Sequence, residues 1–130
     1  MRITITPIVK INTADIAKKI HEAAKESVSA VSTQILKDSN YYAPRRGDGL
    51  VDSSIIAANA TEAFSEIKWD VPYASYVYKG ISKKGKPLKY NKERNPNAQK
   101  EWCKKAKSVH LKDWNEMVED IMKRRFGEKQ

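Results

Sequence analysis

The chain has 130 residues, of which 40% are hydrophobic and 32% are charged, so we expect a single domain spanning residues 1–130. It contains no apolar run long enough to span a membrane, and its first residues lack the apolar region of a signal peptide. The only cysteine is Cys103, which excludes an internal disulfide and a multi-cysteine metal site. We therefore predict no membrane partner and a reducing, cytoplasmic environment.

The net charge of +9 is concentrated in one segment of the chain. Residues 79–107 carry eleven Lys or Arg against Glu93 and Glu101, whereas basic and acidic residues balance in 1–78 and in 108–130. Such a local excess predicts an acidic partner surface or nucleic acid, and a solvated loop is the alternative interpretation. The candidate basic patch consists of Lys79, Lys83, Lys84, Lys86, Lys89, Lys92 and Arg94, with Tyr90 among them.

The first two predicted elements are a strand and a long helix. Alternating isoleucines and threonines predict a strand over 2–9, and Pro7 limits it to an edge position or a strand end. Asn12 or Thr13 is placed to cap a helix over 14–39. The apolar stripe of this helix, spaced by three and four, is Ile16, Ile20, Ala24, Val28, Val31 and Ile35.

A loop and a weaker strand follow the long helix. Glycines and charged residues predict a loop at 45–49, after which Leu50 is expected to re-enter the core. A strand is expected over 53–60, with Ile55 or Ile56 as its apolar anchor.

A second strand completes an antiparallel hairpin. The turn is expected at 60–63, and the strand at 67–71, where apolar residues alternate with Lys68 and Asp70. Pro72 stops this strand and suits the first position of a short helix. That helix carries Tyr73, Tyr76 and Val77 at helical spacing, and Gly80 is placed to end it.

The remaining chain is predicted to be a long exposed basic loop, at about 81–95, followed by a second long helix. Asn95 is expected to cap this helix and Pro96 to occupy its first position. The helix is predicted over 96–125, bent or broken near Ser108, because its apolar spacings are nearly all four and drift around a straight helix. Gly127 is expected to end it.

No catalytic or metal-binding pattern is visible. Cys103 and His110 are seven residues apart, but no third group is available to orient a nucleophile pair, and a structural thiol and imidazole are the better interpretation. Asp48 and Asp52 flank a glycine-containing loop without the rest of a calcium-binding pattern. We therefore predict no enzyme activity, no cofactor and no metal.

Three segments, taken in order, resemble the minor capsid and head–tail joining (neck or tail-completion) proteins of tailed bacteriophages. They are Tyr42-Ala43-Pro44 with Leu50 and Ser53-Ser54-Ile55; Trp69-Asp70-Val71-Pro72-Tyr73-Ala74 with Tyr78 and Gly80; and Asn95-Pro96-Asn97-Ala98 with Trp102 and Trp114. One departure is that Gly47-Asp48 stands where the family usually has Thr-Gly. The residues proposed as core or interface positions are Tyr42, Pro44, Leu50, Trp69, Pro72, Tyr73, Ala74, Tyr78, Gly80, Pro96, Trp102 and Trp114.

The resemblance implies an α+β fold in which a long N-terminal helix packs on a small antiparallel sheet. The residue patterns add a short Tyr-rich helix and a bent or broken C-terminal helix. The resemblance also implies a non-catalytic virion protein of the neck, assembled in the host cytoplasm. Its partners would be portal, adaptor or tail proteins, or further copies of itself in a ring. The alternative hypothesis is a small basic nucleic-acid-binding domain that uses residues 79–107, through non-specific contact with DNA.

Overall fold

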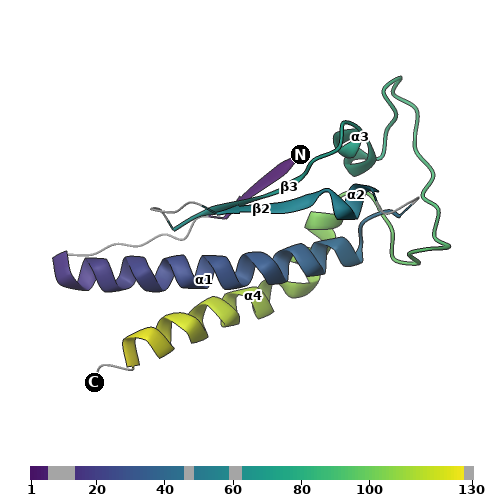
Figure 1. Cartoon of the computed structure of the whole chain (residues 1–130). Coiled ribbons are helices and arrows are strands. Elements are labelled where there is room, and N and C mark those ends of the chain that lie inside the picture. The colour runs from purple at the N-terminus through teal and green to yellow at the C-terminus, as the bar shows by residue number, and fades with distance from the viewer. Residues whose placement is uncertain (6–13, 46–48, 59–62, 128–130) are drawn as a thin grey trace.

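The computed structural model describes residues 1–5, 14–45, 49–58 and 63–127. These residues form two layers, a three-stranded antiparallel sheet and a pair of long helices beneath it (Figure 1). The elements are β1 (Arg2–Ile5), α1 (Ala14–Tyr41), α2 (Gly49–Asp52), β2 (Ser54–Ala58), β3 (Ser65–Trp69), α3 (Ala74–Lys79) and α4 (Trp102–Gly127). The expected α+β class is therefore confirmed. Three of the predictions lie outside the described residues, in whole or in part: the strand residues 6–9, the two candidate caps at 12 and 13, and most of the turn at 60–63.

The sheet has the order β1-β3-β2, with both pairs antiparallel, which confirms the predicted hairpin of β2 and β3. The central strand alternates as a half-buried strand should, because Ser65, Ile67 and Trp69 are buried while the two residues between them are partly exposed. β3 ends at Trp69, two residues before the predicted end. On β2 the anchor is Ile56, which packs against the core, while Ile55 is 47% exposed.

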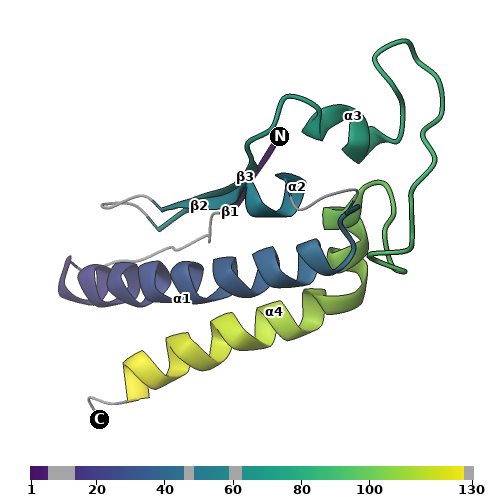
Figure 2. The same cartoon turned by 45° about the vertical axis from the view of Figure 1, so that its right-hand side comes forward.

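The helix α1 extends two residues beyond its predicted end and contacts β2, β3 and α4. Its small buried residues, including Ala24 and Ser27, allow its neighbours to approach closely. The hydroxyl groups of Ser32 on α1 and Ser65 on β3 form a buried hydrogen bond of 2.5 Å between helix and sheet. Figure 2 shows α1 and α4 running side by side, with α3 at one end of the molecule.

One element was not predicted. The four-residue helix α2 begins at Gly49, the last residue of the predicted loop at 45–49, and it is too short to leave a helical period in the sequence. Leu50, its buried residue, is 4% exposed and belongs to the core, as expected.

The predicted start of the second long helix is wrong, because α4 begins at Trp102 rather than at 96. The backbone N–H groups of Gln99 and Glu101 donate to Tyr42 and Tyr78 outside the helix, at 3.1 and 2.8 Å. Glu101 also has a φ of +52°, which no right-handed helix can continue through.

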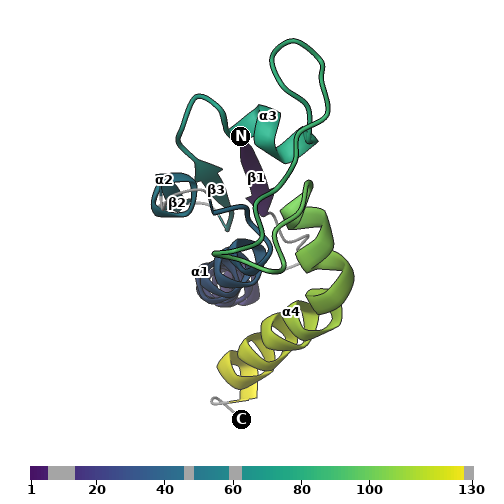
Figure 3. The same ribbon diagram turned by 90° about the vertical axis from the view of Figure 1, so that its right-hand side faces the viewer.

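The bend predicted near the middle of α4 is present as a curve and not as a break. The helix is continuous from Trp102 to Gly127, and its axis changes direction along its length (Figure 3). The hydroxyl of Ser108 donates to the carbonyl oxygen of Lys105 at 2.7 Å, a side-chain bond of the kind that bends helices.

Candidate interaction surface

The candidate interaction surface is the segment 81–95, here named the basic arm. It leaves the C-terminal end of α3, projects away from the sheet and returns toward the start of α4 (Figures 1 and 2). Six of the seven residues of the predicted basic patch lie on this arm, namely Lys83, Lys84, Lys86, Lys89, Lys92 and Arg94, and all six are exposed. The seventh, Lys79, is the last residue of α3. Most of the predicted basic patch therefore lies on one projecting segment of the chain.

The outer half of the arm is a hydrogen-bonded hairpin. The N–H of Ser82 donates to the carbonyl of Lys86 at 2.7 Å, and Ile81 pairs with Pro87 in an isolated bridge. Gly85 supplies the positive φ of +81° that the tip requires. The lysines at the tip are consequently held on a formed turn.

Two contacts fix the base of the arm to α3. The N–H of Leu88 donates to the carbonyl of Gly80 at 2.9 Å, and the hydroxyl of Tyr90 donates to the carbonyl of Val77 at 2.5 Å. Gly80 ends α3 in the left-handed region, with a φ of 79°, which confirms its predicted place. Burial against this site raises the pKa of the Tyr90 hydroxyl. The ring of Tyr90 therefore serves as an anchor of the arm.

A third contact joins the arm to the end of α1. The side-chain amide of Asn95 donates to the carbonyl oxygens of Tyr41 and Ala43, at 2.9 and 2.8 Å. Its carbonyl oxygen accepts the N–H of Asn97 at 3.0 Å, which closes a turn and not a helix. The sequence pattern predicts a helix cap at Asn95 and gives no sign that this residue joins two distant segments.

The three motifs that carry the family resemblance converge in the core. The ring of Trp102 lies 5.8 Å from that of Trp69 and 4.7 Å from that of Tyr78, both edge to face. Of the twelve candidate positions, six are buried: Tyr42, Leu50, Trp69, Ala74, Trp102 and Trp114. Pro44, Tyr78 and Gly80 are partly buried, and Pro72, Tyr73 and Pro96 are exposed. The exposed ones are therefore the candidates for contact with a partner.

Two of the buried tryptophans also donate hydrogen bonds to side chains of α1. The indole N–H of Trp69 donates to the side-chain oxygen of Asn40 at 2.9 Å, and that of Trp114 donates to the carboxylate of Asp38 at 2.7 Å. Both acceptors lie on α1, so each bond fixes one element on that helix. Neither acceptor was singled out by the sequence, because its partner is distant along the chain.

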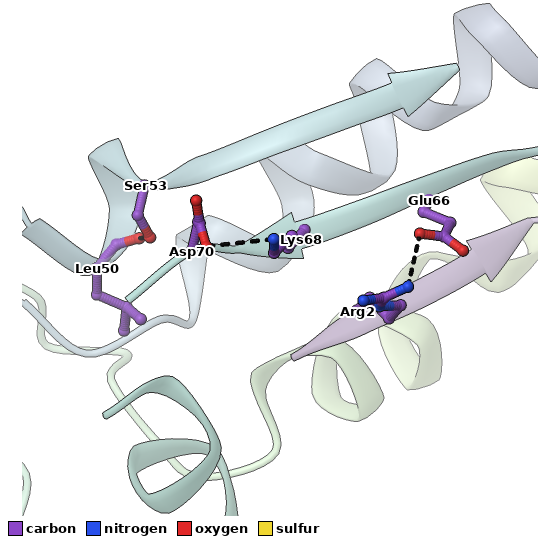
Figure 4. A network of polar contacts seen from close by, with 6 residues as sticks. All are labelled: Arg2, Leu50, Ser53, Glu66, Lys68 and Asp70. Atoms are coloured by element: carbon purple, nitrogen blue, oxygen red, sulfur yellow. Dashed lines mark hydrogen bonds and ion pairs between the residues drawn. The ribbon is translucent and has the colours of Figure 1, made fainter. Parts of the chain in front are cut away.

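The outer face of the sheet differs from the arm in its electrostatics. Arg2 pairs with Glu66 across two strands at 3.4 Å, and Lys68 pairs with Asp70 at 3.3 Å (Figure 4). In contrast, Lys79 and the five arm lysines form no ion pair with any carboxylate in the described part of the chain. The arm and the end of α3 therefore carry a cluster of lysines that no carboxylate of the described residues neutralises.

The residues considered for catalysis do not form a site. Cys103 is buried, and burial raises the pKa of its thiol to about 12, which disfavours a nucleophilic thiolate. His110 stacks on Trp114 and contacts Asp113 at 3.5 Å. Within the described residues, no group of three metal-ligating side chains is present. None of the helices there is both long and apolar enough to cross a lipid bilayer.

Together these features describe an α+β domain with a well-packed aromatic core and a projecting basic arm. A family model described as minor capsid protein matches residues 8–122. The chain therefore belongs to this family of bacteriophage minor capsid proteins and has a structural, virion-associated role alongside other virion proteins. No curated protein and no solved structure matches the chain.

Proposed function

We propose that this minor capsid protein is a component of the head–tail connector, at the neck or tail-completion position, and that it acts through protein contacts without catalysis. In this role it binds portal, adaptor or tail proteins, joins further copies in a ring, and assembles in the host cytoplasm before it is found in the virion. The observation that carries the proposal is the basic arm, whose lysines are exposed, uncompensated and held on an ordered hairpin.

Such an arm suits contact with an acidic neighbouring subunit. Complementary charges steer association and fix the orientation of two partners. Because the arm is hydrogen-bonded to α3 and to the end of α1, less ordering entropy is lost when it binds. The aromatic core beneath it supplies a rigid base.

The test is the location of the protein in purified particles. We expect mass spectrometry to find it in virions and labelled cryo-electron microscopy to place it between the portal and the tail. A triple charge reversal, Lys83→Glu, Lys84→Glu and Lys86→Glu, should lower its incorporation. The matched control reverses Lys18, Lys19 and Lys37, which are exposed on α1, and should leave incorporation unchanged. Placement elsewhere in the particle would refute the connector role.

The second candidate function is non-specific DNA binding by residues 79–107, and the same uncompensated lysines favour it. One contact weighs against it, since Tyr90 donates its hydroxyl to Val77 at 2.5 Å and is partly buried. It is therefore less able to stack on a base. Titration with DNA at two salt concentrations decides between them, because lysine–phosphate contacts predict affinity that falls steeply with salt.

A further inference from the structure

An open groove lies between α3 and the basic arm. Its walls include Pro72, Tyr73, Tyr76, Val77, Lys83 and Leu88, and its volume is about 590 Å³. Tyr73 and Tyr76 are 46% and 38% exposed there, so two aromatic rings present apolar surface to solvent on the same side of the groove. Exposed aromatic groups gathered in a concave site mark a contact with a partner.

Both walls of the groove are fixed by the fold. On one side, the hydroxyl of Tyr73 lies so close to Gly49 that a Cβ at Gly49 would be 3.1 Å from it. On the other, the N–H of Leu88 is bound to the carbonyl of Gly80 at 2.9 Å. A partner would therefore meet a formed groove and would not have to order it.

The chemistry of the walls selects the kind of partner. Pro72, Val77 and Leu88 offer aliphatic contacts, which suit an apolar side chain better than a sugar–phosphate backbone. Lys83 lines the same groove, and Lys79, Lys84 and Lys86 lie on the two elements that form it. These lysines favour a partner that carries carboxylates on either side of the apolar side chain that enters the groove.

We propose that this groove binds an acidic segment of another virion protein, which inserts one aromatic or aliphatic side chain between α3 and the basic arm. The proposal rests on the proposed function, since it names the kind of partner that the connector component meets. A second copy of this chain fits less well, because it would bring a further net charge of +9 against the lysines of the arm.

The first experiment measures peptide binding to the isolated 130-residue protein by fluorescence anisotropy. The probe is a labelled peptide with one phenylalanine between runs of glutamate and aspartate, and its partner probe has alanine in place of the phenylalanine. We expect the phenylalanine peptide to bind about tenfold more tightly, as an anchor residue in a pocket does. Oligothymidine of the same charge is the nucleic-acid probe and should not show the same dependence on the groove.

Variants with matched controls locate the binding. Tyr76→Ala and Lys83→Glu should each weaken the phenylalanine peptide about tenfold. Tyr41→Ala and Lys37→Glu change an exposed tyrosine and an exposed lysine on α1 and should have no effect. Equal affinity for the two peptides, no peptide binding, or losses that are the same for the controls would overturn the proposal. So would oligothymidine binding that depends on Tyr76.

The second experiment places a photo-crosslinking benzoylphenylalanine at position 76 in assembled particles. A cross-link to an acidic segment of a different virion protein supports the proposal, and a cross-link to DNA or to a second copy of the chain overturns it. The peptide assay does not depend on where the protein lies in the particle. The groove can therefore fail while the connector role stands, and the connector role can fail while the groove still binds its acidic probe.

Discussion

Asn95 donates a hydrogen bond of 2.8 Å to the carbonyl oxygen of Ala43, across 52 residues of sequence. Its amide also donates to Tyr41, the last residue of α1, so one carbonyl group at the end of the helix and one just after it obtain partners from the base of the basic arm. Carbonyls at the end of a helix have no partner within it, and burial without one is costly. This one side chain therefore both completes α1 and fixes the arm.

The first prediction concerns the substitution Asn95→Asp, which preserves shape but removes both donors. A carboxylate would then face the two carbonyl oxygens, so we expect the free energy of unfolding to fall by about 3 kcal/mol. Urea denaturation measures it. The control is Asn91→Asp, because Asn91 is exposed and only accepts a hydrogen bond, from the N–H of Glu93. Similar losses in the two variants would contradict the role given to Asn95.

The second prediction compares two glycines that both have positive φ. A Cβ at Gly80 would lie 2.9 Å from the side chain of Lys100 and 3.2 Å from the hydroxyl of Tyr90, whereas a Cβ at Gly85 would meet nothing within 4 Å. Gly85→Ala should cost about 1–2 kcal/mol for the left-handed backbone alone. Gly80→Ala should cost about 1–3 kcal/mol more, because Tyr90 cannot move without losing its bond to Val77. Equal melting temperatures would show that this packing does not matter.

The third prediction compares two fully buried indole rings. The N–H of Trp69 is bound to Asn40 at 2.9 Å, whereas that of Trp102 has no hydrogen-bond partner among the described residues. Replacement by phenylalanine removes similar volume at both sites. We therefore expect Trp69→Phe to cost about 1 kcal/mol more than Trp102→Phe in urea denaturation. A larger loss of stability in Trp102→Phe would mean that the indole N–H of Trp102 has a hydrogen-bond partner in solution.

Much of the fold follows from local patterns in the sequence. The spacing of apolar residues along α1 and the alternation around Ile67 each depend on one element alone, and both were predicted correctly. The same holds for Gly80, since a positive φ after a short helix is adopted most easily by a residue without a Cβ. The family resemblance also rested on short segments that could be recognised one at a time.

The remainder depended on contacts between distant segments. Asn95 followed by Pro96 fits a helix start, but its amide is used by carbonyls at the end of α1, and α4 begins only at Trp102. The groove beside Tyr76 forms only because the arm returns against α3. The local spacing of residues carries no such information. The sequence therefore predicted a basic patch on this chain but not the groove beside it.

The fourth prediction tests the backbone at the start of α4. Glu101 has a φ of +52°, and its side chain makes a surface ion pair with Lys104 at 2.9 Å. Both Glu101→Gly and Glu101→Ala remove this ion pair. The difference between their free energies of unfolding therefore reports the cost of the backbone conformation at residue 101. We expect the glycine variant to be more stable by about 1 kcal/mol, because glycine adopts this conformation without strain. A more stable alanine variant would indicate that residue 101 is helical in solution.

The fifth prediction concerns the buried thiol of Cys103, whose pKa rises from 9.0 to about 12 on burial. The folded protein keeps the thiol protonated, while the unfolded chain releases the proton above pH 9. The contribution of this thiol to the free energy of unfolding is therefore fully present below pH 9 and is lost as the pH rises toward 12. Cys103→Ala removes the effect and leaves every other side chain the same in the two proteins. We expect urea midpoints of the native protein to fall more steeply over this range than those of the variant, and parallel curves would contradict the burial of an uncharged thiol.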